Sequence, residues 1–593
     1  STSGSRGNAA MDLSWIDVTD MRVVGGILAV LAAVYLILDA YVSRTRDGWI
    51  GFWLEFRWIL IVFIVLPLSR GLSAYWRLRD FVYDTFLAKP HLHSSRVAEI
   101  QRRVKAFRAA GGPKAAGGRL LCTSRPQWLR TTLRQMDYQT SKNAIPIPLF
   151  DILELDTEAL TVRVEPSVTM GRLSRFLIAR GYCLQVVPEL DELTVGGLIN
   201  GYGVETSSHK YGLVADTATA YEVVLSSGEV VTATPDNEYA DLFHAVPWSY
   251  GALGFLVCAT LRVRKAEKYV KLSYYPTRTT EETTTLFDGL TVSDSPPNFV
   301  EGLMYNKNEG VVMSGDFAPE SEALAHPDQI NDITIWHKTY FGEHVQNILN
   351  DFKKAGSLTA ASSFAVGVTK PAVVEYIPTV AYFHRHVKGI FWEMKLILPF
   401  GHHAWFRYLF GWSLPASIPL IKATQPPSLT KFYQDRHIAQ DGLVPLEKLP
   451  QGIEFFHKNF ECYPLWLCPH KLCFTSPQGM LRPSKEAVAR GLVKPGKWEQ
   501  YVDIGCYYSP GPILRGEEYD CVQARKNYEQ FLIENSGYQA LYAITEMTRD
   551  QWATMFDTEL YDKCRTKYDA VGWFMDAYDK VCRPKGEAAK KRS

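Results

Sequence analysis

The chain has almost no net charge, and it lacks several signals of glycosylated, repetitive or nucleic-acid-binding proteins. Its 593 residues carry 64 Lys and Arg against 63 Asp and Glu, a balance of +1 that gives no reason to expect a nucleic-acid partner. It contains no Asn-x-Ser/Thr glycosylation acceptor and no internal repeat at fixed spacing. The length and the apolar share of 47% instead predict several domains with a large buried core.

Paired cysteines are also missing. The ten cysteines are scattered between Cys122 and Cys582, and no Cys-x-x-Cys pair occurs. Three of them fall within residues 462–473, near two histidines, but their spacing does not match a structural zinc site. We therefore expect free thiols, a reducing compartment and no metal.

Two apolar runs near the N-terminus, residues 23–38 and 58–68, predict a membrane anchor within residues 11–89. Residues 1–10 are small and polar and are expected to be a cloning remnant. The second run is short, so it either lies in the interface or returns as the second leg of a helical hairpin. The basic stretch 70–108 suits the cytoplasmic face of an anionic membrane. The alternative is a cleaved signal peptide followed by an ordinary core helix.

The most informative stretch is 194–203, which holds four glycines in ten residues. Glycine lets backbone N–H groups approach an anion closely, so the run predicts a cradle for a pyrophosphate. An expected hairpin follows, with strands at 221–225 and 230–232 around the turn 226–229. A tight turn that only needs close backbone packing would give the same pattern, and that alternative stays open.

Short strands and short helices alternate from residue 120 onward, which predicts an α+β fold. Residues 171–180 place apolar side chains on one helical face, and 253–261 reads as a buried strand. The charged stretch 262–268 then marks a domain end near 270. We predict one domain over 90–270 and a second, with a C-terminal segment, over 271–593.

Many further segments make the chain similar to one family. From about residue 90 to 582 it resembles the vanillyl-alcohol-oxidase (PCMH) type of FAD-binding protein, and within that superfamily the delta-24 sterol reductase family. The matching segments are Glu165–Gly171, Pro188–Gly197, Ser207–Gly212, Pro247–Ser249, Gly254–Val257, Tyr382–His386, Phe391–Glu393, Phe406–Trp412 and Tyr501–Gly505.

This resemblance implies a PCMH-type FAD domain of two subdomains, covered by an α+β substrate (cap) domain and preceded by a membrane-anchoring helix or hairpin. It implies that the glycine run wraps the FAD pyrophosphate and that strand residues near 222 and 254 border the adenine. The cofactor-binding residues so assigned are Thr194, Val195, Gly196, Gly197, Leu198, Ile199, Asn200, Gly201, Tyr202, Gly203, Val204, Glu205, Thr206, Ser207, Ser208, His209, Gly212, Glu222, Val224, Gly254 and Val257.

One segment departs from the family pattern. Many relatives have an Arg-Gly-x-Gly-His loop whose histidine can be bonded to the flavin, whereas this chain reads Tyr138–Ala144 there, with no histidine. We therefore expect FAD to be held without a covalent bond. No second dinucleotide signature is present, so a nicotinamide cofactor would enter and leave in turn.

Reduction of an isolated alkene needs a hydride and a proton, and only a cofactor can supply the hydride. Because such an alkene accepts hydride poorly, the site needs a well-placed acid in an apolar pocket. The candidates are His386, Glu393, Asp503 and Tyr501. An extended backbone would place His384 and His386 on one face, and likewise Tyr501 and Asp503. A structural polar network is the competing interpretation for each.

Together these features predict a membrane-bound, FAD-dependent and NADPH-consuming reductase of the delta-24 double bond of sterols. Its expected partners are a sterol and the lipid bilayer, with a homo-oligomer left open. We expect it in the endoplasmic reticulum membrane, facing the cytosol, with the Golgi membrane as the alternative. The competing functions are an FAD-dependent alcohol or lactone oxidase and a non-catalytic sterol-binding protein.

Overall fold

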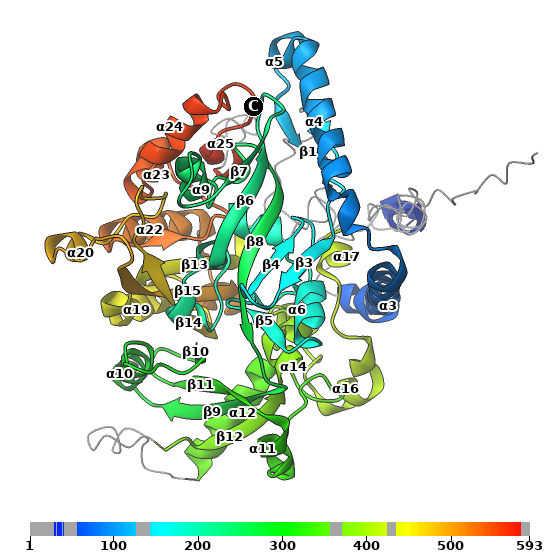
Figure 1. Cartoon of the computed structure of the whole chain (residues 1–593). Coiled ribbons are helices and arrows are strands. Elements are labelled where there is room, and N and C mark those ends of the chain that lie inside the picture. Colours follow the sequence, from blue (N-terminus) through cyan, green and yellow to red (C-terminus); the bar gives the residue numbers. More distant parts are fainter. Residues whose placement is uncertain are drawn as a thin grey trace, which may run out of the picture.

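The structure is a computed structural model that describes residues 29–30, 32–37, 39–40, 56–125, 143–355, 370–423 and 435–582. Two sheets organise these residues, as Figure 1 shows. The predicted cloning remnant, most of the first apolar run and most of the 138–144 segment lie outside the described residues. The expected mixture of helices and strands is confirmed.

The first sheet has the order β3-β4-β8-β6-β7, with β5 paired to β8. All of its ladders are antiparallel. Its strands are β3 Ile152–Asp156, β4 Thr161–Val164, β5 Tyr182–Leu184, β6 Ala218–Val224, β7 Val230–Ala233 and β8 Phe255–Lys265. The predicted hairpin is therefore confirmed as β6 and β7, with Gly228 at φ +80° in the turn that joins them.

The helices of this part surround the sheet. The predicted helix at 171–180 is confirmed as α6, and Thr169 caps it by accepting a hydrogen bond from the Arg172 amide. The bounds are α4 His93–Ala109, α5 Gly112–Ala115, α6 Met170–Ile178, α7 Val195–Asn200, α8 Ser208–Tyr211 and α9 Ala240–Ala245. A separate parallel pair is formed by β1 Leu121–Thr123 and β2 Asn143–Ile145.

The second sheet has eight strands in the order β12-β9-β11-β10-β14-β15-β13-β16. It starts four residues after β8 ends at Lys265, so the change of sheet falls close to residue 270. Its strands are β9 Tyr269–Thr277, β10 Phe299–Met304, β11 Gly310–Ala318, β12 Val373–Pro378, β13 Ile438–Pro445, β14 Leu465–Cys473, β15 Trp498–Tyr508 and β16 Tyr538–Gln539.

One face of this sheet is covered by helices and the other by the first domain. Gly442 of β13 and Ile504 of β15 are paired in the ladder and face the helix side, where Gly442 meets Tyr528 and Ile504 meets Gly452. The opposite face packs on α8 and on the loops around it. The helices on this part include α10 Thr280–Thr291, α12 Phe341–Lys354, α14 Thr379–Phe383, α16 Ala404–Phe410, α17 Ile418–Ala423, α19 Leu449–Asn459 and α22 Cys521–Glu534.

The C-terminal helices return to the first domain, which the sequence patterns did not reveal. They are α23 Arg549–Met555, α24 Glu559–Lys567 and α25 Ala577–Val581. Arg565 donates to the Ala252 carbonyl at 3.0 Å, and Phe574 pairs with Leu121. Figure 1 shows α24 beside α9. The end of the chain therefore closes the first domain rather than extending the second.

A buried polar cluster joins α4 to the first sheet. His93 lies 2.8 Å from Glu165 and 3.4 Å from Glu222. Burial alone would lower the pKa of His93, but its hydrogen bonds to the two carboxylates outweigh burial and raise it to about 9. Because the unfolded pKa is near 6.5, this ion pair stabilises the fold fully below about pH 6.5 and loses its effect as pH rises through 9.

We therefore expect His93→Gln to lower the thermal midpoint most at pH 6 and progressively less toward pH 9. The measurement is the midpoint of both proteins at each pH, and the quantity of interest is their difference. A difference that stays constant across this pH range would contradict a protonated His93.

Candidate functional site

The glycine run forms α7 and the loop that follows it, and its glycines serve two purposes. At Gly196 an added Cβ would lie 2.6 Å from Pro166, and at Gly203 it would lie 2.8 Å from Val214, so both glycines are needed for packing. At Gly197 it would meet only the Thr194 hydroxyl, at 3.2 Å. Gly197 is exposed, whereas Leu198 and Ile199 next to it are buried. One flank of α7 is therefore open.

The same loop leaves several backbone amides unpaired. Within the described part of the chain, no group accepts a hydrogen bond from the backbone N–H of Gly197, Tyr202, Gly203 or Val204. Gly203 and Val204 are nevertheless buried, and buried N–H groups almost always have a partner. These residues fit a group rich in acceptor oxygens, such as a diphosphate. None of these residues has a positive φ, so close approach rather than backbone strain explains the glycines.

The remaining predicted cofactor residues have structural partners. His209 lies between the carbonyl oxygens of Thr206 and Pro297, at 2.9 and 2.8 Å. Glu222 accepts a hydrogen bond from Arg163 at 2.8 Å, and it belongs to the His93 cluster. Val224 and Val257 are buried in the core between β6, β8 and α4. An added Cβ at Gly254 would lie 2.6 Å from Val223.

A buried ion cluster joins the glycine loop to the second sheet. Arg385 donates to Glu205 at 2.8 Å and to both oxygens of Glu301, on β10, at 2.7 and 2.8 Å. Trp466, on β14, donates to Glu301 at 2.9 Å. Burial alone would raise the pKa of Glu301, but the charge and hydrogen bonds of Arg385 outweigh burial and lower it. Burial and the nearby Glu205 raise the pKa of Glu189.

Removal of Arg385 should destabilise the protein strongly, since Glu205 and Glu301 would keep buried charges without a counter-ion. We expect Arg385→Met to cost about 3–5 kcal/mol, as broken buried pairs do. The matched control is Arg515→Met, because Arg515 pairs with Glu461 on the surface, and an exposed pair contributes about 1 kcal/mol or less. Denaturant unfolding of both variants tests this, and equal losses would contradict the assignment.

Of the four predicted catalytic residues, Asp503 is the one that touches the glycine loop. The Tyr202 hydroxyl donates to Asp503 Oδ2 at 2.7 Å, while Oδ1 is buried and has no partner among the described residues. Burial, with the charge of Asp441 added, raises the pKa of Asp503 well above its usual range. Asp503 is therefore a buried carboxyl between the loop and the sheet, and its raised pKa favours the protonated form.

The other three candidates lie elsewhere. His386 stacks on Phe391 and is 3.4 Å from Glu301, and burial lowers its pKa. Glu393 is 3.0 Å from His437. The Tyr501 hydroxyl donates to the Ser536 carbonyl at 2.9 Å. The four candidates thus contact different partners, although Tyr501 and Asp503 lie two residues apart on β15.

Residues 384–386 form a turn after α14, so the extended backbone expected there is wrong. His384 instead lies 2.7 Å from Ser174 on α6, and Arg385 donates to Glu205, so both residues link the two domains. Tyr501 and Asp503 do share one face of β15, as predicted. Sequence reasoning missed Arg385, Glu205 and Glu301 as one cluster, because they are far apart in the chain and no spacing signals the contact.

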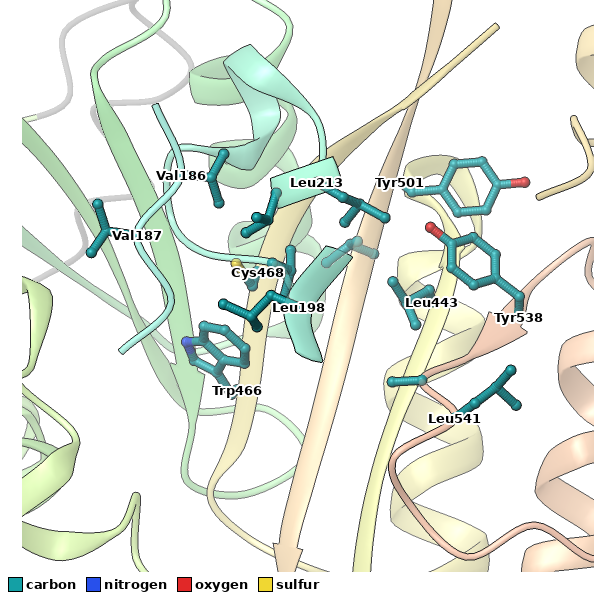
Figure 2. Close-up of a cluster of buried hydrophobic side chains, with 14 of the residues drawn as sticks. Val186, Val187, Leu198, Leu213, Leu443, Trp466, Cys468, Tyr501, Tyr538 and Leu541 are labelled. Carbon is teal, nitrogen blue, oxygen red and sulfur yellow. The ribbon is translucent and has the colours of Figure 1, made fainter. Parts of the chain in front are cut away.

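Apolar side chains of both domains fill the space around these groups. Figure 2 shows Val186, Val187, Leu198 and Leu213 of the first domain facing Trp466, Cys468 and Leu443 of the sheet. Leu465, Trp466 and Leu467 are at most 2% exposed, so this run belongs to the core. The site therefore combines a buried carboxyl of raised pKa with backbone N–H groups that lack an acceptor, and apolar side chains surround both.

A site of this kind defines an FAD-binding protein, and comparison with known proteins agrees. Residues 137–234 match the family described as FAD binding domain. The chain is 41% identical to the Delta(24)-sterol reductase of Arabidopsis thaliana over 552 residues, 91% of this chain and 93% of that protein. It is 40% identical to the Delta(24)-sterol reductase of Homo sapiens over 527 residues, 89% and 93% of the two chains. The chain therefore belongs to the Delta(24)-sterol reductase family.

A shorter similarity bears on the competing oxidase. The chain is 35% identical to the D-arabinono-1,4-lactone oxidase of Yarrowia lipolytica over 101 residues, which is 17% of this chain and 19% of that protein. Such a short match does not show that this chain belongs to the oxidase family.

Proposed function

We propose that the protein is a membrane-bound, FAD-dependent enzyme that reduces the delta-24 side-chain double bond of sterols with NADPH. The observation that carries this proposal is the contact between Tyr202 and Asp503, which places a buried acid beside the unpaired amides of the glycine loop. Membership of the Delta(24)-sterol reductase family supports the substrate class. A PCMH-type arrangement of two FAD subdomains, as the family resemblance implies, fits the first sheet and the β1–β2 pair.

FAD, when bound and reduced, supplies the hydride that no side chain can provide. The amides of Gly197 and of Tyr202 to Val204 would hold its diphosphate. Arg385, through Glu205, fixes the loop against the second sheet. These residues bind and orient the cofactor, and their apolar surround excludes water.

Asp503 is the proton donor of this proposal. The added proton would leave Asp503 Oδ1, which no described residue engages. Tyr202 keeps the carboxyl oriented through Oδ2 and can stabilise the carboxylate that remains. The net reaction adds one hydride and one proton across the double bond, and NADPH leaves as NADP⁺. The proton is not assigned to His386, Glu393 or Tyr501, because each contacts another partner.

The proposal also includes attachment of the protein to a membrane and the identity of that membrane. Residues 11–89 anchor the protein in the endoplasmic reticulum membrane, with the catalytic domains in the cytosol and the Golgi membrane as a second location. No disulfide joins the ten cysteines, all of which lie among the described residues, and this supports a reducing compartment. One described helix, Phe56–Val82, is long and apolar enough to cross a membrane.

The test is steady-state turnover of the purified protein in detergent. We expect NADPH oxidation that requires a delta-24 sterol, and a product two hydrogens heavier than the substrate. Hydrogen peroxide release with a soluble alcohol or lactone, and no sterol-dependent NADPH oxidation, would favour the oxidase instead. Bound FAD that NADPH never reduces would favour a sterol-binding protein.

A further inference from the structure

The helix Phe56–Val82 is fastened to the folded body along its whole length. Near its start Trp58 packs edge-on against Phe400, with ring centroids 5.7 Å apart. In its middle the Ser417 amide donates to the Ser69 hydroxyl at 2.9 Å. Just past its end Tyr83 packs on Phe150 at 5.0 Å. A helix of this length extends about 40 Å, so these contacts hold it flat along the protein.

The middle contact leads directly to the cofactor loop. The Ser417 hydroxyl donates to Glu192 at 3.2 Å, and Glu192 is two residues before Thr194. If the helix crossed a bilayer, Ser69 would lie inside it and would take Ser417 and Glu192 with it. Placing the Glu192 carboxylate in hydrocarbon is costly, so these contacts argue against a helix that crosses the bilayer.

The two faces of this helix are both apolar, which is unusual for a helix on a water-soluble surface. The inner face, with Ile61, Val62, Val65 and Leu66, is at most 4% exposed and packs on the segment 394–421. Exposed apolar side chains also form an outward stripe, in two groups near the ends of the helix, with the exposed Arg70 and Arg77 between them in sequence. Its members are Phe56, Ile59, Phe63, Leu78 and Phe81, which are 41 to 63% exposed.

A second exposed apolar segment continues this stripe. In α16 and the short helix Gly411–Ser413, Phe406 is buried and holds the segment in place, while Phe410 packs against Phe63 with ring centroids 6.1 Å apart. Figure 1 places α3 Leu66–Val82, α16 and α17 together on one side of the molecule. The exposed side chains of this segment are Trp405, Tyr408, Leu409 and Trp412, at 49 to 61%.

We propose that these two segments form one bilayer-docking surface, and that the helix Phe56–Val82 lies in the plane of the membrane instead of crossing it. The surface consists of the outward stripe of the helix together with the four exposed side chains of 405–412. Tryptophan and tyrosine favour the headgroup region, and an apolar helix face inserts about 5–10 Å into it. Arg70 and Arg77 are exposed on the helix and suit anionic headgroups.

This inference rests on the proposed function in one respect only, which is the claim that the sterol substrate reaches the protein at this surface. A sterol dissolved in the bilayer would meet the protein at this face, because the helix connects through Ser417 to the segment that begins the cofactor loop. The docking geometry itself depends only on the contacts above.

Fluorescence quenching in vesicles tests the geometry on the full chain. The variants Leu409→Cys, Phe63→Cys and Phe81→Cys carry an NBD label, and the protein is placed in phosphatidylcholine vesicles with doxyl-labelled lipids. Leu514→Cys is the matched control, because Leu514 is 57% exposed and Leu409 is 61% exposed. Nine of the ten native cysteines are buried, and the labelled parent protein gives the background.

We expect shallow doxyl groups to quench about half or more of the emission at 409, 63 and 81, as for a helix at the headgroup boundary, and little at 514. A crossing helix would separate positions 63 and 81 by about 27 Å along its axis, so they would respond to doxyl groups at different depths. Such a difference in depth, or quenching at 409 no greater than at 514, would overturn the proposal.

The use of the surface has its own readout. We expect the double variant Leu409→Asp with Trp412→Ser to lose activity several-fold on sterol carried in vesicles. The same variant should keep its activity on sterol delivered by cyclodextrin, and Leu514→Asp should be unchanged in both assays. Equal losses with both sterol sources would overturn the role of the surface. If the parent protein reduces no sterol at all, the proposed function fails, while the quenching result stands on its own.

Discussion

Gly197→Glu should yield a folded protein that has lost its FAD. Gly197 is the position in the glycine run whose missing side chain meets only Thr194, so a Glu side chain would enter the open flank of α7. It would also bring a negative charge to the amides that hold the diphosphate. Loss of two such hydrogen bonds to a charged group costs about 3–6 kcal/mol, which weakens binding at least ~100-fold.

The measurement is the flavin absorbance of the purified variant relative to its protein content. Gly289→Glu is the matched control, because Gly289 also lies in a helix, α10, and has nothing within 4 Å of an added Cβ. We expect that control to keep its flavin. Normal flavin content in Gly197→Glu would remove the glycine loop from the cofactor site.

Asp503→Asn should separate the two halves of the reaction. The amide keeps the hydrogen bond from Tyr202 through its oxygen but has no acidic proton to give. Loss of a general acid lowers the rate by about 10²–10⁴-fold. We therefore expect NADPH to reduce the bound flavin at the parent rate, and the transfer to sterol to become slow. Rapid-mixing absorbance at the flavin band measures each half separately.

Glu529→Gln is the control for burial. Glu529 is also a buried carboxyl with a raised pKa, to about 7 because of burial, but it binds Thr545 and lies away from the glycine loop. We expect this variant to retain both half-reactions. If the Asp503→Asn variant reduces the sterol as fast as the parent protein does, another group must supply the proton.

The parts of the site that are local in sequence could be predicted, and those built by long-range contacts could not. The hairpin β6–β7, helix α6 and the glycine run follow from spacing and turn residues within about ten positions. The Arg385 cluster instead joins residues 205, 301 and 385, which no periodicity relates. The expected pairing of His384 with His386 failed because the chain turns after α14.

The glycine run also shows why a motif alone is ambiguous. Gly196 and Gly203 are packing glycines, as the alternative interpretation expects, whereas Gly197 is open and fits the predicted cradle, which stays a prediction. The sequence could not distinguish them, because the distinction depends on Pro166 and Val214, which reach the loop from other segments. The same holds for the second apolar run, whose apolar inner face is explained by the segment 394–421 packed against it.

The most direct test of the account is an anaerobic titration of the purified parent protein, followed by its flavin absorbance. The account predicts that NADPH bleaches the flavin band and that a delta-24 sterol then restores it, whereas the saturated sterol does not. A band that NADPH bleaches but that only oxygen restores, with no response to the sterol, would contradict it.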